Sequence, residues 1–198
     1  MKIVTYYLDG LCRAYPLFIV VSFLSFGIIF QVKLYLFYSL SVFIELLTNM
    51  LIWKKLAKKY WNNYPFLSRV FGQGERPCEY CSCGSFRILE TQSKSSLSSI
   101  DTIPISDCHS KENAMVEFGM PSGHAQIACS VATFWLLYLS NSNLLGIWNS
   151  LYLILIALGV SLSRVLINCH TPGQVIVGGG LGVLTAIFNY NLFKYHLV

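Results

Sequence analysis

The sequence predicts an all-α integral membrane protein: a single domain, residues 1–198, folded as a bundle of about five transmembrane helices. The chain is 55% hydrophobic and only 12% charged, whereas about 25% of the residues in a soluble domain are charged. Its mean hydropathy is +0.56. Five apolar runs approach the length of about 20 residues that a helix needs to cross a bilayer. The net charge of +5 does not indicate nucleic-acid binding, because the basic residues flank the apolar runs instead of forming a stripe.

The first two apolar runs lie near the N-terminus. Residues 1–13 are polar and aromatic, and we expect them at the membrane interface. They lack the charged start, apolar core and cleavage site of a signal peptide, so the first membrane helix should direct insertion. Residues 14–31 and 34–53 form the two runs, and a tight turn at 31–33 separates them.

Two polar side chains, Glu45 and Asn49, lie at helical spacing on one face of the second run. An acid in a membrane helix faces other helices, where it either bonds to them or takes part in function. For Glu45 we favour interhelical hydrogen bonding over catalysis.

The segment between the second and third runs is polar. Residues 54–72 mix lysines with aromatic side chains, a composition typical of an interfacial segment. Residues 78–119 are predicted to be a flexible loop with a serine-rich middle, of which 79–112 is an insertion. The clustered cysteines of this loop are compatible with a zinc site, with disulfides or with free thiols. They are Cys78, Cys81, Cys83 and Cys108, the last followed by His109.

Three more apolar runs follow, at residues 121–139, 147–167 and 172–193. Gly178 and Gly182 in the last run form a small-xxx-small face suited to close helix packing. Counting the crossings places three polar clusters on the same side of the membrane. They are Arg69 with Arg76-Pro77, then Pro121-Ser122-Gly123-His124, and then Ser163 to Gln174.

These clusters carry the groups that phosphoryl transfer requires: a nucleophile, a proton donor, and donors around the phosphoryl oxygens. Pro121 and Pro172 each indicate the first turn of a helix, whose N–H groups form a natural anion site. Arginine side chains match phosphate oxygens in geometry. The clusters contain three arginines and two histidines: Arg69, Arg76, Arg164, His124 and His170.

Structural alternatives exist for several of these residues. Arg164 could be an arginine at a helix end that snorkels to the interface, and His124 could be an ordinary polar residue of a first helical turn. Cys169 stands alone in the sequence, and no base is placed to make it a nucleophile. We interpret His109 and His196 as surface residues.

The three clusters resemble the signature of the type 2 phosphatidic acid phosphatase (PAP2) superfamily, K-x6-R-P, P-S-G-H and S-R-x5-H-x3-D. Arg69 replaces the first lysine and Gln174 replaces the last aspartate, while Pro121 to His124 match without change. The resemblance covers roughly residues 16–190 apart from the inserted loop. The longer matching stretches are similar to dolichyl-diphosphate phosphatases.

The resemblance implies a phosphatase that works through a phosphohistidine, with no metal and no cofactor. His170 would attack phosphorus, and His124 would protonate the leaving oxygen. Gln174 would replace the aspartate that orients the nucleophile, since a glutamine carbonyl can accept an N–H from His170 and fix its tautomer. The phosphoryl group would be held by Arg69, Arg76, Ser122, Gly123 and Arg164.

The expected substrate is a lipid phosphate or a polyisoprenyl diphosphate of the dolichyl type, because a site embedded in the membrane suits a substrate whose tail stays in lipid. Two alternatives stay open: a phosphatase for a soluble sugar phosphate, similar to the glucose-6-phosphatases, and an inactive relative that binds lipid phosphate.

The resemblance also implies the endoplasmic reticulum membrane, with the site facing the lumen. Four lysines on the side of the site oppose this orientation, because the positive-inside rule would place them in the cytosol. They are Lys54, Lys55, Lys58 and Lys59. We favour the lumenal orientation.

Overall fold

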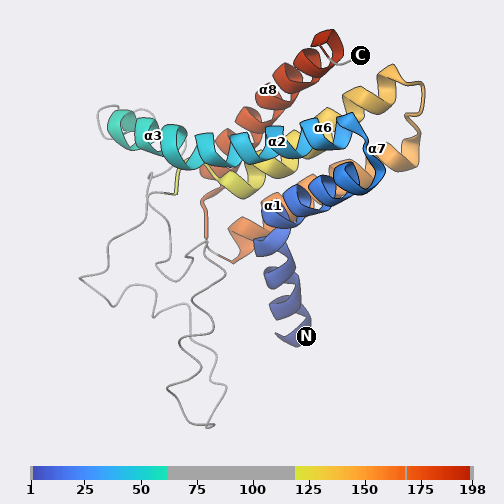
Figure 1. Ribbon diagram of the computed structural model, residues 1–198. Coiled ribbons are helices and arrows are strands. Elements are labelled where there is room, and N and C mark those ends of the chain that lie inside the picture. The colour runs from blue at the N-terminus through green and yellow to red at the C-terminus, as the bar shows by residue number, and fades with distance from the viewer. Residues whose placement is uncertain (1, 62–118, 168, 197–198) are drawn as a thin grey trace, which may run out of the picture.

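The computed structural model describes residues 2–61, 119–167 and 169–196, and the side chains within them at 14–60, 119–167 and 169–195. All the regular structure in these ranges is helical, as predicted (Figure 1). The elements are α1 (Lys2–Phe30), α2 (Lys33–Thr48), the π-helix η1 (Asn49–Trp53), α3 (Lys54–Trp61), α6 (Gly123–Asn141), α7 (Ile147–Leu166) and α8 (Pro172–His196).

Helices α1 and α2 form an antiparallel pair. The predicted turn is confirmed: Gln31 takes a left-handed conformation with φ of 53°, which reverses the chain. The Ser39 hydroxyl of α2 donates to the carbonyl of Val20 in α1 at 2.9 Å. Helix α1 begins at Lys2, earlier than the apolar run itself, which starts at residue 14.

The second apolar run continues without a break through η1 into α3. One continuous helix, Lys33–Tyr60, 28 residues, is a candidate membrane span, so residues 54–61 are helical and continue the second run, while their expected place at the interface stays a prediction. The rest of the expected interfacial segment, 62–72, and the inserted loop 79–112 lie outside the described residues.

Within the part of the chain that the structure describes, three helices are long and apolar enough to cross a membrane, at Lys33–Tyr60, Ile147–Leu166 and Pro172–Tyr195. The apolar part of α1, Ala14–Phe30, is shorter. Their outer faces expose large apolar side chains, of which Trp148 is 80% exposed. Such a surface is stable against lipid and not against water, so the chain is an integral membrane protein.

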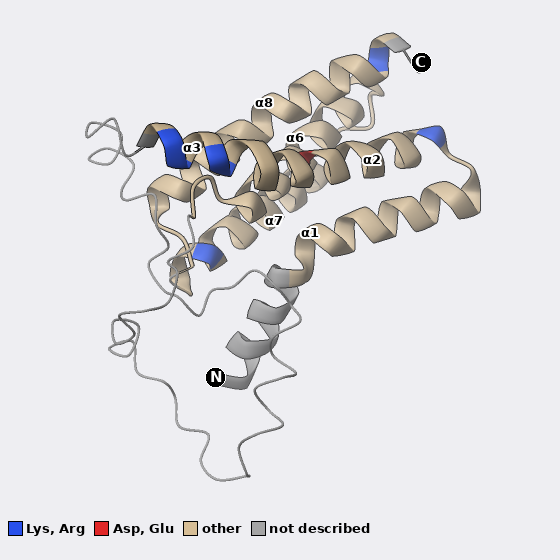
Figure 2. Cartoon of the chain, turned by 60° about the vertical axis from the view of Figure 1, so that its left-hand side comes forward, with Lys and Arg blue, Asp and Glu red and all other residues tan. Residues whose placement is uncertain are grey.

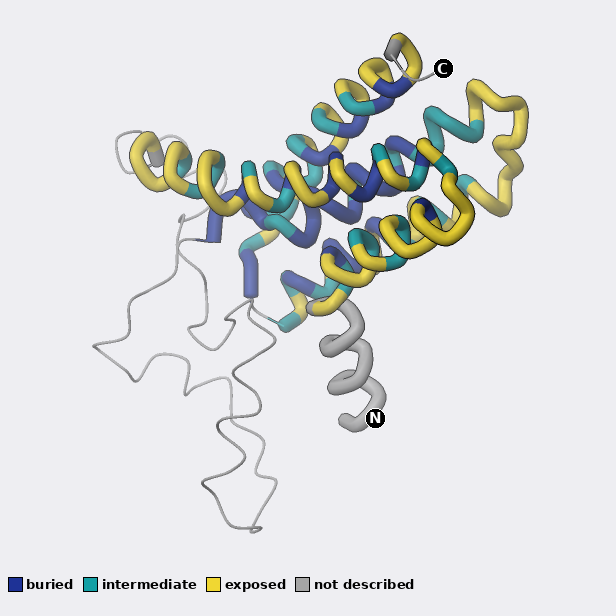
Figure 3. The backbone as a smooth tube through the Cα atoms, in the orientation of Figure 1, coloured by how far each residue is buried: buried dark blue, intermediate teal, exposed yellow. Residues whose placement is uncertain are grey.

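Helix α6 occupies the centre of the bundle and packs against α8, α7, α1 and α2. Figure 3 shows it largely buried, while the outer faces of the surrounding helices are exposed. The start of α6, with Ser122 and His124, is therefore buried in the interior of the protein.

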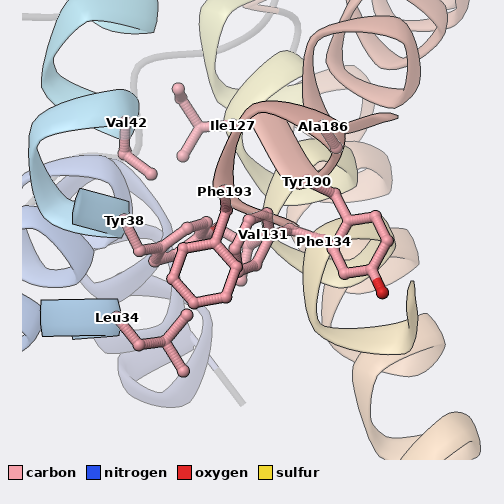
Figure 4. Packing of buried hydrophobic residues seen from close by; sticks show 9 residues of the cluster. All are labelled: Leu34, Tyr38, Val42, Ile127, Val131, Phe134, Ala186, Tyr190 and Phe193. Atoms are coloured by element: carbon pink, nitrogen blue, oxygen red, sulfur yellow. The ribbon is translucent and has the colours of Figure 1, made fainter. Parts of the chain in front are cut away.

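The apolar core lies at the half of the bundle away from that first turn. Tyr38 of α2 and Phe134 of α6 pack with ring centroids 4.4 Å apart. Figure 4 shows the nine core residues, which come from α2, α6 and α8: Leu34, Tyr38, Val42, Ile127, Val131, Phe134, Ala186, Tyr190 and Phe193. Because one half of the bundle is packed with aromatic and aliphatic side chains, its polar half is held on a rigid frame.

The predicted small-residue face of α8 is confirmed. A Cβ added at Gly178 would overlap the carbonyl oxygen of Ser122, and one at Gly182 would overlap the carbonyl oxygen of Gln126. Only glycine at these two positions lets the backbones of α8 and α6 approach so closely. The pair therefore brings the start of α8 against the start of α6.

Basic residues gather at the end of the bundle where α3 lies and α7 ends, and Figure 2 shows other basic residues at the opposite ends of α2 and α8. The end of α7, the start of α8 and the start of α6 belong to the same side, as the counting of crossings predicts.

Candidate active site

The first turn of α6 forms one wall of the candidate site. Ser122 is the N-cap residue of α6, but its side chain makes no capping hydrogen bond. The hydroxyl is fully buried and has no hydrogen-bond partner among the described residues. The first N–H of α6 to bond back along the helix is that of Gln126, to the Ser122 carbonyl at 3.0 Å. The hydroxyl and the positive end of α6 together form an arrangement suited to an anion.

Pro121 differs from its expected place. It precedes the N-cap residue, and the first helical residue is Gly123. The extended backbone of Ser122, with φ of −70° and ψ of 110°, starts the helix one residue after the cap. Pro172, by contrast, is the first residue of α8, as predicted.

The loop between α7 and α8 forms the second wall. The carbonyl of Arg164 accepts hydrogen bonds from the N–H groups of both Cys169 and His170, each at 3.0 Å. These bonds tie the histidine to the last turn of α7. Arg164 is 1% exposed and His170 is 2% exposed. Both side chains are therefore buried in the protein, and Arg164 does not snorkel to the interface.

Gln174 connects the parts of this loop. Its Oε1 lies 3.0 Å from His170 Nδ1 and accepts from the backbone N–H of Thr171 at 3.2 Å. The Gln174 N–H in turn donates to Thr171 Oγ1 at 3.3 Å. This reciprocal pair is a capping box, the T-x-x-Q pattern that starts a helix. Gln174 thus caps the start of α8 and also contacts His170.

The two walls are joined directly. The N–H of Ser122 donates to the backbone carbonyl of Gln174 at 3.1 Å, and Gly178 packs against Ser122 one turn further along α8. The cluster that begins α6 and the cluster that begins α8 therefore meet, although some 50 residues separate them in the sequence.

Six of the eight predicted site residues lie among the described residues: Ser122, Gly123, His124, Arg164, His170 and Gln174. All are buried except Gly123, which is half-buried. Arg69 and Arg76 lie outside the described residues. The structure adds Thr171 and Gln126 to the set. The T-x-x-Q pattern could have revealed Thr171, whereas no local pattern indicates Gln126.

Cys169, which stands alone in the sequence, is not a free thiol, because it is disulfide-bonded in the structure. A cysteine in a disulfide cannot act as a nucleophilic thiolate. Cys129 is a free thiol. Within the described ranges no three side chains of metal-binding type gather closely enough to hold a metal ion. The cysteine cluster from Cys78 to Cys108 lies outside those ranges.

The fold and the site define a class: a membrane helix bundle in which buried histidine and arginine side chains and two helix starts meet at one end. The family model of the PAP2 superfamily matches residues 34–197. The chain belongs to this superfamily, a family of membrane phosphatases. Comparison with curated proteins and with solved structures gives no match. The particular likeness to dolichyl-diphosphate phosphatases stays a prediction.

Proposed function

We propose that the protein hydrolyses a lipid phosphate or a polyisoprenyl diphosphate of the dolichyl type through a phosphohistidine at His170. The observation that carries this proposal is the contact between His170 Nδ1 and Gln174 Oε1 at 3.0 Å, in a loop bonded to the start of α6. It gives a buried histidine a defined orientation beside an anion-binding helix start.

The contacts of Gln174 support Nε2 of His170 as the nucleophilic nitrogen in this proposal. The N–H of Thr171 can bond only to an acceptor, so the amide of Gln174 presents Oε1 to this loop. The ring nitrogen facing Oε1 must then carry the proton, because two acceptors do not attract each other. Nδ1 is the donor, and Nε2 retains the lone pair that attacks phosphorus.

The phosphoryl group would be held by groups from both walls. The Ser122 hydroxyl and the first N–H groups of α6, including that of Gly123, form the helix side. Arg164 supplies a buried guanidinium, which suits the negatively charged oxygens of a phosphate group. Arg69 and Arg76 complete the set in our proposal, on the basis of the signature alone.

The reaction would run in two steps. Nε2 of His170 forms a bond to phosphorus while the bond to the leaving oxygen breaks, and His124 donates a proton to that oxygen. Water then attacks the phosphohistidine, His124 takes up a proton from it, and inorganic phosphate and free His170 are released. We propose that no metal takes part, since histidines and arginines supply the nucleophile, the acid and the positive charge.

A lipid substrate is favoured by the exposed apolar side chains that surround the polar end. Leu166, at the end of α7 and close to Arg164 in the chain, is 81% exposed. An acyl or isoprenyl tail could lie against such a surface in the bilayer while the phosphate enters between the two helix starts. A soluble sugar phosphate would gain nothing from it.

The endoplasmic reticulum lumen is our proposed location for the site. Support comes from Cys169, next to His170, because disulfides persist in oxidising compartments. The lysines of α3 on the same side favour the cytosol. A membrane-impermeant thiol reagent should label Cys169 in sealed microsomes only after permeabilisation and reduction. Labelling of Cys169 in microsomes that are still sealed would place the site in the cytosol.

The two histidines provide the test of the mechanism. General acid catalysis is worth about 10²–10⁴-fold and matters least for a good leaving group. We expect His170→Ala to be inactive on both an alkyl phosphate and an activated aryl phosphate. We expect His124→Ala to fail on the alkyl phosphate but to keep measurable turnover of the aryl phosphate and covalent labelling at His170.

A panel of dolichyl diphosphate, phosphatidate and glucose 6-phosphate, tested on the purified protein, identifies the substrate. Preference for glucose 6-phosphate would favour the soluble-substrate alternative. Binding of the lipid phosphates without release of phosphate would show an inactive relative. Wild-type turnover in His170→Ala would refute the phosphohistidine.

A further inference from the structure

A buried polar ladder connects the middle of the bundle to the candidate site. Its lower step is Glu45 of α2, 3% exposed. One carboxylate oxygen accepts from the Ser130 hydroxyl of α6 at 2.7 Å, and the other accepts from the Thr185 hydroxyl of α8 at 2.7 Å. The expected interhelical role of Glu45 is therefore confirmed, and the residue ties three helices together below the site.

The upper step is Asn49, four residues later on the same face and 2% exposed. Its Nδ2 donates to Oε1 of Gln126 in α6. Its Oδ1 lies 3.3 Å from the point where a Cβ on Gly123 would stand. The Asn49 side chain of η1 thus approaches α6 at two places, and a Cβ on Gly123 would make the second approach tighter than most real Cβ contacts.

The local backbone helps to place this side chain. Asn49 is the first residue of η1, where the α-helical ladder widens to a π-helix before resuming in α3. Such π-bulges are frequently found at functional sites in other proteins. Here the bulge begins at the residue that contacts the start of α6.

His124 lies between the two contacts, one residue after Gly123 and two before Gln126. On its other side α6 is held by α8, through the Ser122–Gln174 bond and the close approach of Gly178 and Gly182. The turn that carries His124 is therefore held from α8 on one side and by Asn49 of η1 on the other.

We infer that Asn49 is a positioning residue for the proton-donating His124, acting through Gln126 and Gly123. The inference rests on the proposed function, because it assigns Asn49 a role in leaving-group protonation. A shift of the first turn of α6 would misplace the imidazole relative to the leaving oxygen. Attack on a substrate that needs no protonation would suffer much less.

The test compares leaving groups in the full-length protein. We expect Asn49→Ala to lower kcat on an alkyl phosphate about tenfold, as loss of a hydrogen bond of ordinary strength would, and to lower kcat on 4-nitrophenyl phosphate less than about threefold. Gln126→Met, which keeps the side-chain length but removes the acceptor, should show the same selectivity. Ser39→Ala is the matched control: it removes another buried hydrogen bond of α2, to Val20 in α1, and should affect both substrates equally.

A double-mutant cycle separates positioning from general destabilisation. The cycle uses phenyl phosphate, whose leaving group gains from protonation but is good enough for His124→Ala to keep measurable turnover. If Asn49 acts through His124, Asn49→Ala should cause no further loss on this substrate in the His124→Ala background. Equal losses on both substrates, or an additive loss in the double variant, would overturn the inference while leaving the phosphatase proposal intact. Absence of phosphate release by the wild-type protein from either substrate would instead overturn the proposed function, and this inference with it.

Discussion

Replacing Gly178 by alanine should separate the two walls of the site. The added methyl group would overlap the Ser122 carbonyl oxygen and would lie 3.0 Å from the Ser122 nitrogen. Ordinary contacts of a carbon atom begin near 3.5 Å. Both obstacles are backbone atoms, which cannot rotate away, so α8 and the start of α6 must move apart.

The size of the effect follows from this displacement. Relieving the overlap requires a shift of about 1 Å, and a misplacement of that size can cost about 10²-fold in rate. Overpacking costs about 1–3 kcal/mol, while exchange of glycine for alanine inside a helix returns about 1 kcal/mol. The free energy of unfolding should therefore fall by only about 0–2 kcal/mol. We expect a folded protein with kcat/KM lowered about 10²-fold.

Gly180 gives the matched control, because it lies on the same helix and a Cβ there would meet nothing within 4 Å. Gly180→Ala should leave activity unchanged and raise the melting temperature slightly. Phosphate release and thermal melting of both variants, measured in the same detergent or nanodisc, check the prediction. Full activity in Gly178→Ala at an unchanged melting temperature would show that the closeness of α8 to Ser122 is not needed for the reaction.

Three other predictions follow from the site. Turnover should survive excess chelator, and loss of activity in EDTA that magnesium restores would contradict the proposed metal-independent route. Shortening the polar loop at residues 84–107 should leave most of the activity, since loop length alone costs little; a folded but inactive deletion would show that the loop helps to build the site. Gln174→Glu keeps a side-chain acceptor for the capping box and should retain kcat within about threefold. Gln174→Leu removes the side-chain contacts with Thr171 and His170 and should lower kcat about tenfold or more. Equal kcat values for these two variants would show that the contact with His170 does not matter.

The sequence by itself determined the apolar helices and the meeting of the second and third clusters at one end of the bundle. Long apolar runs fix the crossings because backbone groups in lipid must be bonded within each helix. The turn at Gln31 and the glycine pair of α8 are short-range or periodic patterns, and both were predicted correctly. The capping box at Thr171 was also present in the sequence, since it depends on residues only three apart.

One helix boundary followed packing more than the local sequence pattern. Pro121 was expected in a first helical turn, yet the chain stays extended through Ser122. A neighbouring element decided this boundary, because the start of α6 is held by Gln174 of α8 and not by its own cap.

Only the tertiary structure decided which distant polar groups meet. Asn49 and Gln126 are 77 residues apart, and either could have bonded to many other side chains in a buried bundle. Glycine backbones, a π-helical turn and the aromatic core together set the distance between α2, α6 and α8. A hydrogen bond forms only when donor and acceptor approach to about 3 Å, and a one-dimensional pattern contains no information on that distance.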